Sequence, residues 1–384
     1  MGDAQKLTPD EQIAFARDAF ENADDMTVAV EEEFQLLDPD TLELTGRFEE
    51  LKEAAAGTEL DEHLVGELIS SEIEVKTGRC ETFAVAADRM AERRRQLGAL
   101  VDAHGVAIAS TGTHPWSRWQ DQRIIDTPHY RLNDEILRYV VWRNNSFGIH
   151  VHVAVRGADR AVAVCNAFRN VLPELLAFSA SSPFVEDVVT GLHSVRTEIF
   201  TRMFPRCGVP DVYDGWKGFE EYVRFLYDTG SIREHTQMWW SVRPHLAFPT
   251  IEVRICDAQP DLSVAQSLAA LIHALAARFV RAIDEGEPLP SLPHRLIEEN
   301  LWRATRFGLS GGLIDFERRE VVPARTRIQQ LVDWVEPVAR EIGASAFLDV
   351  PVADSAEQQY ARLAELGSHR AAFTELVRLP ERVA

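Results

Sequence analysis

Three short segments of this chain place acidic or imidazole side chains two residues apart among aliphatic residues. They are Glu31–Glu33, Glu72–Glu74 and His150–His152. Side chains on a β-strand alternate between its two faces. Each segment therefore predicts a strand with one polar face and one aliphatic face, as where Val30 and Phe34 flank the first segment. These segments constrain the chain to a fold that contains a sheet with a polar face.

A fourth segment of the same kind, Ile251–Ile255, adds Glu252 and Arg254. If the four strands share one sheet, its open face gathers carboxylates, imidazoles and a guanidinium group. Such a face is costly to bury unless cations bind to it. Carboxylate oxygens suit Mg²⁺ or Mn²⁺, and these cations suit nucleotide phosphates. The combination predicts a metal and nucleotide site, although each segment alone is also typical of a charged surface or a cross-strand ion pair.

Glu32 does not fit the polar face, because it points to the same side as the aliphatic residues. It is expected to lie at a sheet edge or to pair with an arginine. The run Arg93–Arg95 lies in a helical pattern with acidic neighbours, and we expect it to be exposed to solvent. The segment Gly308–Gly312 matches the glycine–serine–glycine pattern of a nucleophile elbow, but it follows a helical pattern and is interpreted as a turn.

The pattern of the whole chain predicts an α+β fold in a single domain, residues 1–384, with a helical C-terminal section from about residue 262 to 384. Strands are expected at residues 27–37, 72–76, 106–110, 147–155, 238–243 and 250–256. Earlier helices are expected at residues 9–22, 47–56, 61–70, 80–103, 133–144, 160–179 and 219–228. Residues 181–215 are expected to form a loop. Residues 111–130 are also expected to form a loop, which is either functional or packed over the core by its tryptophans.

Composition excludes several classes of protein. The chain has 384 residues and a net charge of −21, which argues against binding nucleic acid or an anionic membrane. No run approaches 18 apolar residues, so no membrane span is expected. The cysteines are scattered and few, which favours a reducing cytoplasm. The chain lacks the phosphate-binding loop of P-loop enzymes and the glycine fingerprint of dinucleotide-binding folds.

Eight motifs occur in one order and together resemble the glutamate–cysteine ligase type 2 family, the carboxylate–amine ligases of bacteria. The resemblance spans roughly Met26 to Phe316, and the combination is far more specific than any single motif. Two departures stand out: Ala29 replaces a usual glycine, and Lys76–Gly78 replaces a usual Asn-Thr-Gly. The motifs are Thr27–Leu37, Glu72–Gly78, Gly112–Pro115, Trp119–Gln122, Phe147–Val153, Ser179–Phe184, Trp239–Pro244 and Thr250–Asp257.

The resemblance implies a glutamine-synthetase-like fold, in which a curved, mainly antiparallel sheet flanked by helices forms a funnel for metals, ATP and an amino acid. It also implies roles for individual residues. The implied metal ligands are Glu31, Glu33, Glu74, His150 and Glu252. Glu33 and Arg254 are the implied catalytic residues, with Arg254 contacting phosphate. His152 is assigned to the nucleotide and Glu72 to the substrate. Arg196 and Arg243 are candidates for a substrate carboxylate, because arginine binds carboxylates bidentately.

The leading hypothesis is an ATP-dependent ligase that uses Mg²⁺ or Mn²⁺. A substrate carboxylate would attack the γ-phosphate of ATP to give an acyl phosphate, and an amine would then displace the phosphate. The family's usual substrates are glutamate and cysteine, so the expected partners are small-molecule amino acids and amines, and a homodimer stays open. The alternatives are a metal-dependent hydrolase or phosphotransferase on the same sheet, and a non-catalytic nucleotide-binding relative.

Overall fold

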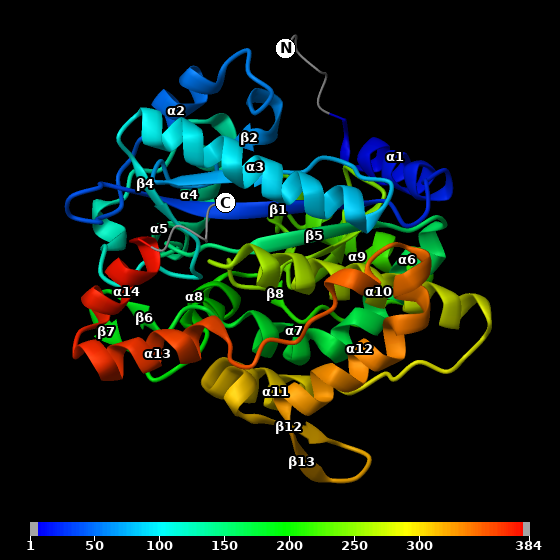
Figure 1. The fold of residues 1–384 in the computed structure, drawn as a ribbon. Helices are drawn as coiled ribbons and strands as arrows, with labels where there is room; N and C mark the ends of the chain where they lie inside the picture. The colour runs from blue at the N-terminus through cyan, green and yellow to red at the C-terminus, as the bar shows by residue number, and fades with distance from the viewer. Residues whose placement is uncertain (1–6, 379–384) are drawn as a thin grey trace.

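A computed structural model describes residues 7–378, and within them a seven-stranded antiparallel sheet forms the centre of the protein (Figure 1). Six strands follow the order β10-β11-β5-β1-β3-β2, and β4 pairs with the far end of β1. The strands are β1 (Val28–Leu37), β2 (Leu64–Val65), β3 (Glu72–Lys76), β4 (Ala107–Ala109), β5 (Ile149–Ala154), β10 (Val242–Pro244) and β11 (Thr250–Val253). The four polar segments of the sequence are thus β1, β3, β5 and β11, as predicted.

The register of the sheet brings the predicted site residues opposite one another. On β1, Glu31 lies opposite His150 of β5, and Glu33 lies opposite Glu74 of β3. On the other side of β5, His152 lies opposite Glu252. Directly opposite residues of antiparallel strands share one face of the sheet. One face therefore carries the acidic and imidazole groups of four strands.

The opposite face of the sheet is apolar and packs on helices. Val30, Val151 and Val253 belong to the main hydrophobic core together with residues of α3 (Phe83–Ala103), α6 (Ala158–Phe168) and α10 (Leu262–Asp284). Figure 1 shows α3 lying along the sheet and the C-terminal helices forming the lower front of the molecule. Thr82 caps α3 and Asp261 caps α10, each accepting a hydrogen bond from a backbone N–H of the first turn.

Two helical stretches, Ala158–Ser179 and Leu262–Asp284, are long and apolar enough to cross a membrane. In the structure 83% and 78% of their most apolar windows are buried inside the protein. Their apolar residues therefore pack in the core described above.

The remaining elements surround the sheet. The other helices are α1 (Pro9–Glu21), α2 (Phe48–Ala55), α4 (Pro128–Leu137), α5 (Tyr139–Trp142), α7 (Leu172–Ser179), α8 (Val195–Met203), α9 (Gly215–Asp228), α11 (His294–Phe307), α12 (Ala324–Glu341), α13 (Ser355–Leu366) and α14 (His369–Arg378). The short strands β6 (Phe184–Val185) and β7 (Val188–Val189), β8 (Cys207–Gly208) and β9 (Trp239–Trp240), and β12 (Gly312–Asp315) and β13 (Glu320–Pro323) form three separate pairs.

Two of the element predictions differ most from the structure. Residues 61–70 do not form a helix: Asp61–His63 is a single 3-10 turn, and β2 follows it. Gly66 explains part of the difference, because its Cα lies against the ring of Phe48 and an added Cβ would stand 2.5 Å from that ring. The predicted loop 181–215 contains α8, whose buried residues include Val195 and Ile199. The turn at Gly308 is confirmed, as Gly308–Ser310 forms one 3-10 turn before β12.

Glu32 pairs with an arginine, which was one of the two arrangements expected for it from the sequence. Its partner is Arg94 of α3, whose Nη2 lies 2.6 Å from Glu32 Oε1. Arg94 also donates hydrogen bonds to the carbonyl oxygens of Gln259 and Pro260. The prediction that this arginine is solvent-exposed is wrong, since only 1% of it is accessible. The ion pair therefore joins β1 to α3 inside the protein.

The loop of residues 111–130 is held to the core by His114. Its Nε2 donates to the carbonyl oxygen of Leu42 at 2.8 Å, and its Nδ1 accepts from the backbone N–H groups of Trp116 and Ser117. Only a neutral imidazole can donate at one nitrogen and accept at the other. Burial accordingly lowers the pKa of His114 to about 3. For this residue the structural interpretation of the loop holds.

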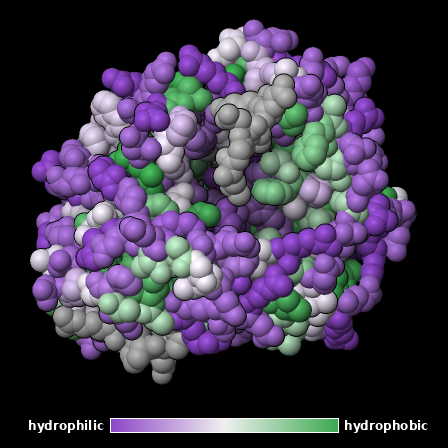
Figure 2. Space-filling view, turned by 90° about the horizontal axis from the view of Figure 1, so that it is seen from above, coloured by the Kyte–Doolittle hydropathy of each residue, from purple (hydrophilic) through white to green (hydrophobic). Residues whose placement is uncertain are grey.

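The outer surface agrees with the strongly acidic composition. Seen from above, hydrophilic residues cover most of the molecule, hydrophobic residues gather in small patches, and the surface is hollowed near its centre (Figure 2).

Candidate active site

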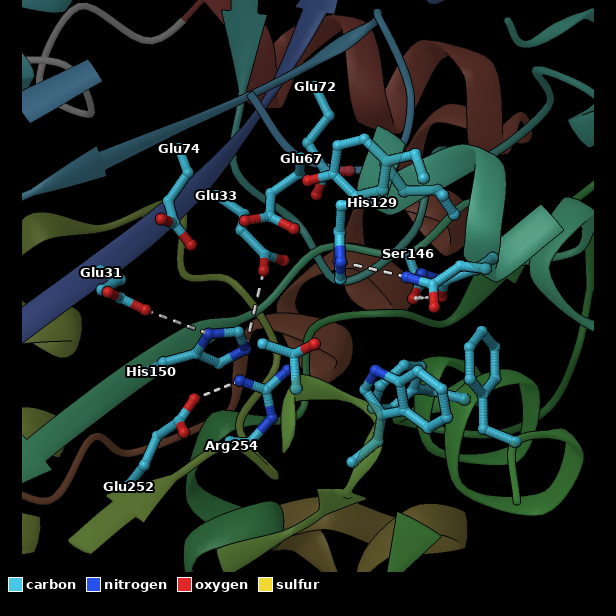
Figure 3. A pocket seen from close by; sticks show the side chains of 18 of the residues that line it. Glu31, Glu33, Glu67, Glu72, Glu74, His129, Ser146, His150, Glu252 and Arg254 are labelled. Carbon is cyan, nitrogen blue, oxygen red and sulfur yellow. Dashed lines mark hydrogen bonds and ion pairs between the residues drawn. The ribbon is translucent and has the colours of Figure 1, made fainter. Parts of the chain in front are cut away.

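A cavity of about 260 Å³ opens against the polar face of the sheet (Figure 3). All of the site residues predicted from the sequence line it. They are Glu31, Glu33, Glu72, Glu74, His150, His152, Arg196, Arg243, Glu252 and Arg254. The structure thus brings together residues from five strands and helix α8, while the chemical roles of these residues stay predictions.

The densest group of carboxylates lies where β1 meets β3. Glu33 and Glu74 stand directly opposite each other, an arrangement that is destabilising for like charges. One cation is present, because Lys76 Nζ lies 3.0 Å from Glu31 and 2.8 Å from Glu74. Burial, together with repulsion from Glu31 and Glu67, nevertheless raises the pKa of Glu74 well above its usual value.

Two further carboxylates add to this excess of negative charge. Glu72 is only 3% exposed, and burial, reinforced by repulsion from Glu33 and Glu67, raises its pKa well above the usual value. Burial and the charge of Glu33 raise the pKa of Glu67 to about 7. Sequence reasoning missed Glu67, because it lies in the connection from β2 to β3 that was predicted to be helical. A single glutamate in that position carries no signal of its own.

The two histidines of β5 stand between carboxylates of neighbouring strands. His150 Nδ1 lies 3.6 Å from Glu31, and its Nε2 lies 3.6 Å from Glu33. His152 Nε2 lies 3.5 Å from Glu31 and 3.8 Å from Glu252. Burial and the charge of Arg254 lower the pKa of His150, whereas the charges of Glu31 and Glu252 outweigh burial and raise the pKa of His152.

Glu252 differs from the β1 and β3 carboxylates because arginines already bind both of its oxygens. Arg243 Nε donates to Oε2 at 2.7 Å, and Arg254 Nη1 donates to Oε1. Although burial opposes a charge here, Arg243 and Arg254 hold the pKa of Glu252 well below its usual value. A metal at Glu252 would therefore share these oxygens with the two arginines.

Arg196 reaches the cavity from the first turn of α8. Its guanidinium donates to the carbonyl oxygens of Ile255 and Arg254 and lies 3.8 Å from the buried Asp257. An added Cβ at Gly148 would stand 2.4 Å from Arg196 Nη2, so only glycine leaves room for this arginine. The side chain is thus fixed on the wall that faces the carboxylates.

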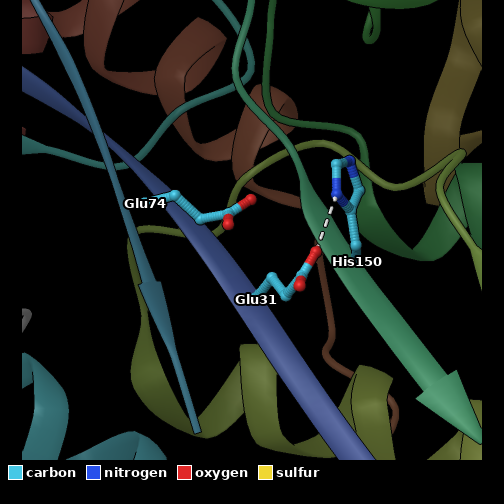
Figure 4. A group of neighbouring side chains, drawn as sticks. All are labelled: Glu31, Glu74 and His150. Carbon is cyan, nitrogen blue, oxygen red and sulfur yellow. Dashed lines mark ion pairs between the residues drawn. The ribbon is translucent and has the colours of Figure 1, made fainter. Parts of the chain in front are cut away.

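The residues of this face fit a divalent cation. Ligand atoms of Glu31, Glu74 and His150 lie within 4.8 Å of one another, and so do those of Glu31, His152 and Glu252 (Figure 4 shows the first group). A bound cation would relieve the opposition of Glu33 and Glu74 and the raised pKa values of Glu67, Glu72 and Glu74. Oxygen-rich sets of this kind suit Mg²⁺ or Mn²⁺.

A second cavity, of about 310 Å³, adjoins the first at the start of β1 and the end of β5. The two cavities share Glu31, Lys76, His152 and Phe248. Apart from these, the second cavity is lined largely by small or apolar residues such as Val28, which makes it a different environment from the carboxylate face.

One face of α4 forms a further wall of the cavity. His129, Asn133 and Leu137 are four residues apart, so they lie in a row on that face, and all three line the cavity. His129 Nδ1 lies 2.6 Å from Glu234. Sequence reasoning missed this pair, because its members are more than a hundred residues apart. Apolar residues continue this wall: Leu68, Val141, Phe200, Phe204 and Trp239.

Comparisons with known proteins agree with this geometry. The model of the Glutamate-cysteine ligase family 2 matches residues 27–363. A protein of Sorangium cellulosum named "Putative glutamate–cysteine ligase 2" is 38% identical, over 91% of this chain and 95% of that protein. A Rubrobacter xylanophilus protein named "Putative glutamate–cysteine ligase 2-3" is 40% identical, over 89% of this chain and 93% of that protein.

Solved structures share the fold at low sequence identity. Glutamate–cysteine ligase of Francisella tularensis in complex with AMP superimposes with a TM-score of 0.63 and 13% identity, over 93% of this chain and 88% of that one. A bifunctional glutathione synthetase of Pasteurella multocida gives 0.66 and 12%, over 92% of this chain and 52% of that one. The predicted α+β, glutamine-synthetase-like fold class is confirmed. The chain belongs to the glutamate–cysteine ligase family 2 and is an enzyme of the carbon–nitrogen ligase type.

Proposed function

We propose that the protein is an ATP-dependent carboxylate–amine ligase that works through an acyl phosphate. The observation that carries this proposal is the face on which Glu33 and Glu74 oppose each other, with Arg254 and Arg196 on the walls around it. Joining a carboxylate to an amine through phosphoryl transfer brings several negative charges together. A site with both cation-binding carboxylates and fixed arginines matches that requirement.

The carboxylates of β1 and β3 are assigned to metal binding. Glu31, Glu33, Glu74 and His150 would hold Mg²⁺ or Mn²⁺, and a bound divalent cation would neutralise charge on the phosphates of ATP. Glu252 remains a candidate metal ligand, and in this structure Arg243 and Arg254 bind its two oxygens. In that state it also fixes Arg254, which is the residue assigned to the transferring phosphate.

The second cavity supports binding of a nucleotide at this end of the sheet. Its apolar lining at Val28 and Pro249 suits a flat base such as adenine, and the shared residue His152 lies between the two cavities. A base in the second cavity would direct its phosphates toward the carboxylates of β1 and β3. The F. tularensis relative was solved with AMP, which agrees with use of an adenine nucleotide by this fold.

The acid substrate is assigned to the arginine side of the main cavity. Arg196 and Arg243 are the candidates for its carboxylate, because arginine binds carboxylates bidentately, and Glu72 is the candidate for its ammonium group. The names of the relatives favour glutamate as the acid and cysteine as one amine. Both substrates are small molecules, and we propose no nucleic-acid or membrane partner.

The test is a screen of ADP release against a matrix of amino acids and amines in the presence of Mg²⁺ and ATP. A ligase releases ADP and phosphate in stoichiometric amounts only when an acid and an amine are both present. Release of ADP or phosphate without any amine would favour a hydrolase or phosphotransferase instead. Binding of ATP without turnover of any pair would favour a non-catalytic nucleotide-binding protein.

A further inference from the structure

Lys76 is the last residue of β3 and adds a positive charge to the carboxylate face. It alternates with Glu72 and Glu74 along the strand, so the three side chains lie on the same face of the sheet. The register also places Lys76 directly opposite Glu31 of β1. Among the described residues that line the main cavity, Lys76 is the only lysine. The junction of β1 and β3 therefore carries an ammonium group as well as carboxylates.

This ammonium group bridges two carboxylates that come from different strands. Lys76 Nζ lies 3.0 Å from Oε1 of Glu31 and 2.8 Å from Oε1 of Glu74. The same two glutamates form, with His150, one of the groups whose ligand atoms lie within 4.8 Å of one another. Mg²⁺ binds carboxylate oxygens at about 2.1 Å. A metal ion and the ammonium group therefore cannot both bridge these two Oε1 atoms.

The backbone beside Lys76 is fixed to β1. The next residue, Thr77, donates its backbone N–H to the carbonyl oxygen of Val30 at 2.9 Å, and its hydroxyl accepts the N–H of Val30 at 2.9 Å. The side chain of Glu74 is 2% exposed and that of Glu31 is 16% exposed, whereas Lys76 keeps 36%. The lysine thus reaches from the rim to carboxylates that salt screens less than it screens surface charges.

Other oxygens of the same face remain for a divalent ion. Glu31 Oε2 lies 3.6 Å from His150 Nδ1 and 3.5 Å from His152 Nε2. Glu33 Oε1 lies 3.6 Å from His150 Nε2. The ammonium group and a divalent ion thus have separate places. The ammonium group lies at the Oε1 atoms of Glu31 and Glu74, and the ion would lie around His150.

The contacts of Lys76 differ from those of the arginines at Glu252. Two arginines bind that one carboxylate, so they compensate its charge locally. Lys76 instead joins Glu31 of β1 to Glu74 of β3, as a bridging metal ion does. It also lines the second cavity, so phosphates that extend from a base there toward the carboxylates would pass beside its charge. Lys76 therefore has the position of a cation in a site for phosphoryl transfer.

We propose that the ammonium group of Lys76 takes the place of one divalent ion in the active site, an inference that rests on the metal binding assigned to this face in the proposed function. The ammonium group neutralises Glu31 and Glu74 at their shared position and leaves the oxygens around His150 to Mg²⁺ or Mn²⁺. The protein therefore binds one divalent ion fewer than the same carboxylates would hold without the lysine.

Lys76→Met tests this proposal in nucleotide-free protein. Methionine has a similar length, carries no charge and offers no oxygen to a metal. Bound Mn²⁺ is counted by equilibrium dialysis, with the free ion measured by electron paramagnetic resonance. We expect Lys76→Met to bind one more Mn²⁺ ion per chain than the wild type, because the bridging position between Glu31 and Glu74 becomes available.

Thermal melting gives a second measurement on the same variant. Without metal, Lys76→Met should melt several degrees below the wild type, because Glu31 and Glu74 lose the cation that they share. Saturating Mn²⁺ should remove most of this difference, since an ion that binds only the folded protein stabilises it. An ion pair with a purely structural role would give the loss without the recovery.

Lys52→Met is the matched control. Lys52 also pairs with a carboxylate, with Nζ 2.8 Å from Asp61, and its side chain is 38% exposed, but it does not line the cavity. It should leave the number of bound ions unchanged. Adding Glu74→Gln to Lys76→Met should remove the extra ion. Lys76→Gln, whose amide can still donate to a carboxylate, is a second neutral variant and should gain the ion as well.

Equal numbers of bound Mn²⁺ ions in the wild type and in both neutral variants of Lys76 would overturn the proposal. An extra ion that persists when Glu74 is also changed would overturn it too, because that ion would lie elsewhere. A wild type that binds no Mn²⁺, with or without ATP, would instead overturn the metal binding of the proposed function. The two failures are therefore distinguishable, and neither measurement depends on turnover.

Discussion

Glu32 and Glu33 are neighbours on β1 and are buried to nearly the same degree, with exposed fractions of 5% and 6%. The surroundings of their charges differ. Glu32 points to the apolar face and meets Arg94, which donates to it through both Nε and Nη2. Glu33 points to the polar face, where Glu74 stands opposite and the nearest ring nitrogen of His150 is 3.6 Å away.

The difference separates charges that maintain the fold from charges that are arranged for a ligand. On the apolar face the carboxylate is fully compensated within the protein. On the polar face Glu33, Glu67, Glu72 and Glu74 crowd together and exceed the cations provided by the chain. Glu252 resembles Glu32 in its pairing, although it lies on the polar face. Glu67 and the two carboxylates of β3 are therefore the ones that most need an external cation.

Glu32→Gln should produce the largest loss of stability, because it removes the carboxylate charge that Arg94 binds through both Nε and Nη2 inside the protein. Removing one partner of a buried pair costs roughly 3–5 kcal/mol of unfolding free energy. Denaturant unfolding measures this, and kcat per folded molecule should stay within a few-fold. Glu92→Gln, in the exposed pair with Arg95 on the same helix, should change stability by less than about 1 kcal/mol. Equal losses of unfolding free energy in Glu32→Gln and Glu92→Gln would show that the buried ion pair does not stabilise the fold more than the exposed one.

Glu33→Gln should show the opposite behaviour. If Glu33 helps to hold the cation at the transferring phosphate, kcat should fall by about two to three orders of magnitude, equivalent to roughly 2.7–4 kcal/mol. Unfolding without metal should require at least as much free energy as in the wild type, since repulsion from Glu74 is relieved. Near-normal turnover, or a stability loss as large as that of Glu32→Gln, would contradict the assignment of the two faces.

Mg²⁺ with ATP should stabilise the native state, because a ligand that binds only the folded protein raises its unfolding free energy. The gain is about 2.7 kcal/mol at a hundredfold excess over Kd. Thermal melting measures it, and excess EDTA should abolish most of it. Glu32→Gln should retain the gain and Glu33→Gln should lose much of it. If ATP alone raised the melting temperature by the same amount, the phosphates would not be bound to the carboxylates through metal ions.

Arg196→Lys should have the smallest effect and act on one substrate. Lysine keeps the charge but cannot bind a carboxylate bidentately, so KM for the acid should rise by about tenfold, or roughly 1.5 kcal/mol, while KM for ATP changes little. Steady-state kinetics distinguish the two constants. Arg202→Lys, on the same helix but paired with Glu298, is the matched control. Parallel changes in both KM values would place Arg196 outside the acid subsite.

The strands of the site could be predicted from the sequence because a two-residue period is a local signal. β1, β3, β5 and β11 each carry alternating polar and aliphatic residues, and a shared sheet followed from the cost of an isolated polar face. The sequence indicated that Glu32 could pair with an arginine, but it did not indicate that this arginine is Arg94. A signal for it exists, since Met90, Arg94, Leu97 and Val101 form the buried stripe of α3. The arginine run obscured that helical period.

The remaining parts of the site depend on contacts between distant segments. Glu67 lines the cavity from the connection between β2 and β3, where Gly66 packs against Phe48 from a distant helix. His129 and Glu234 meet through the packing of α4 on the turn before β9, and neither segment carries a catalytic motif. Arg196 was chosen for its chemistry, yet its position depends on α8, which the sequence pattern did not reveal. Single residues on loops carry too little local pattern to be placed without the tertiary structure.

Mild acid should weaken the protein through the ring of His114. In the unfolded chain this imidazole takes up a proton near its usual pKa of 6.5, whereas burial lowers the pKa of the folded side chain to about 3. The stability that depends on the neutral ring is therefore complete above pH 6.5 and is lost progressively as the pH falls toward 3. Over that interval the loss is on the order of several kcal/mol. A ring that only anchors a loop thus sets a lower limit to the pH at which the enzyme stays native.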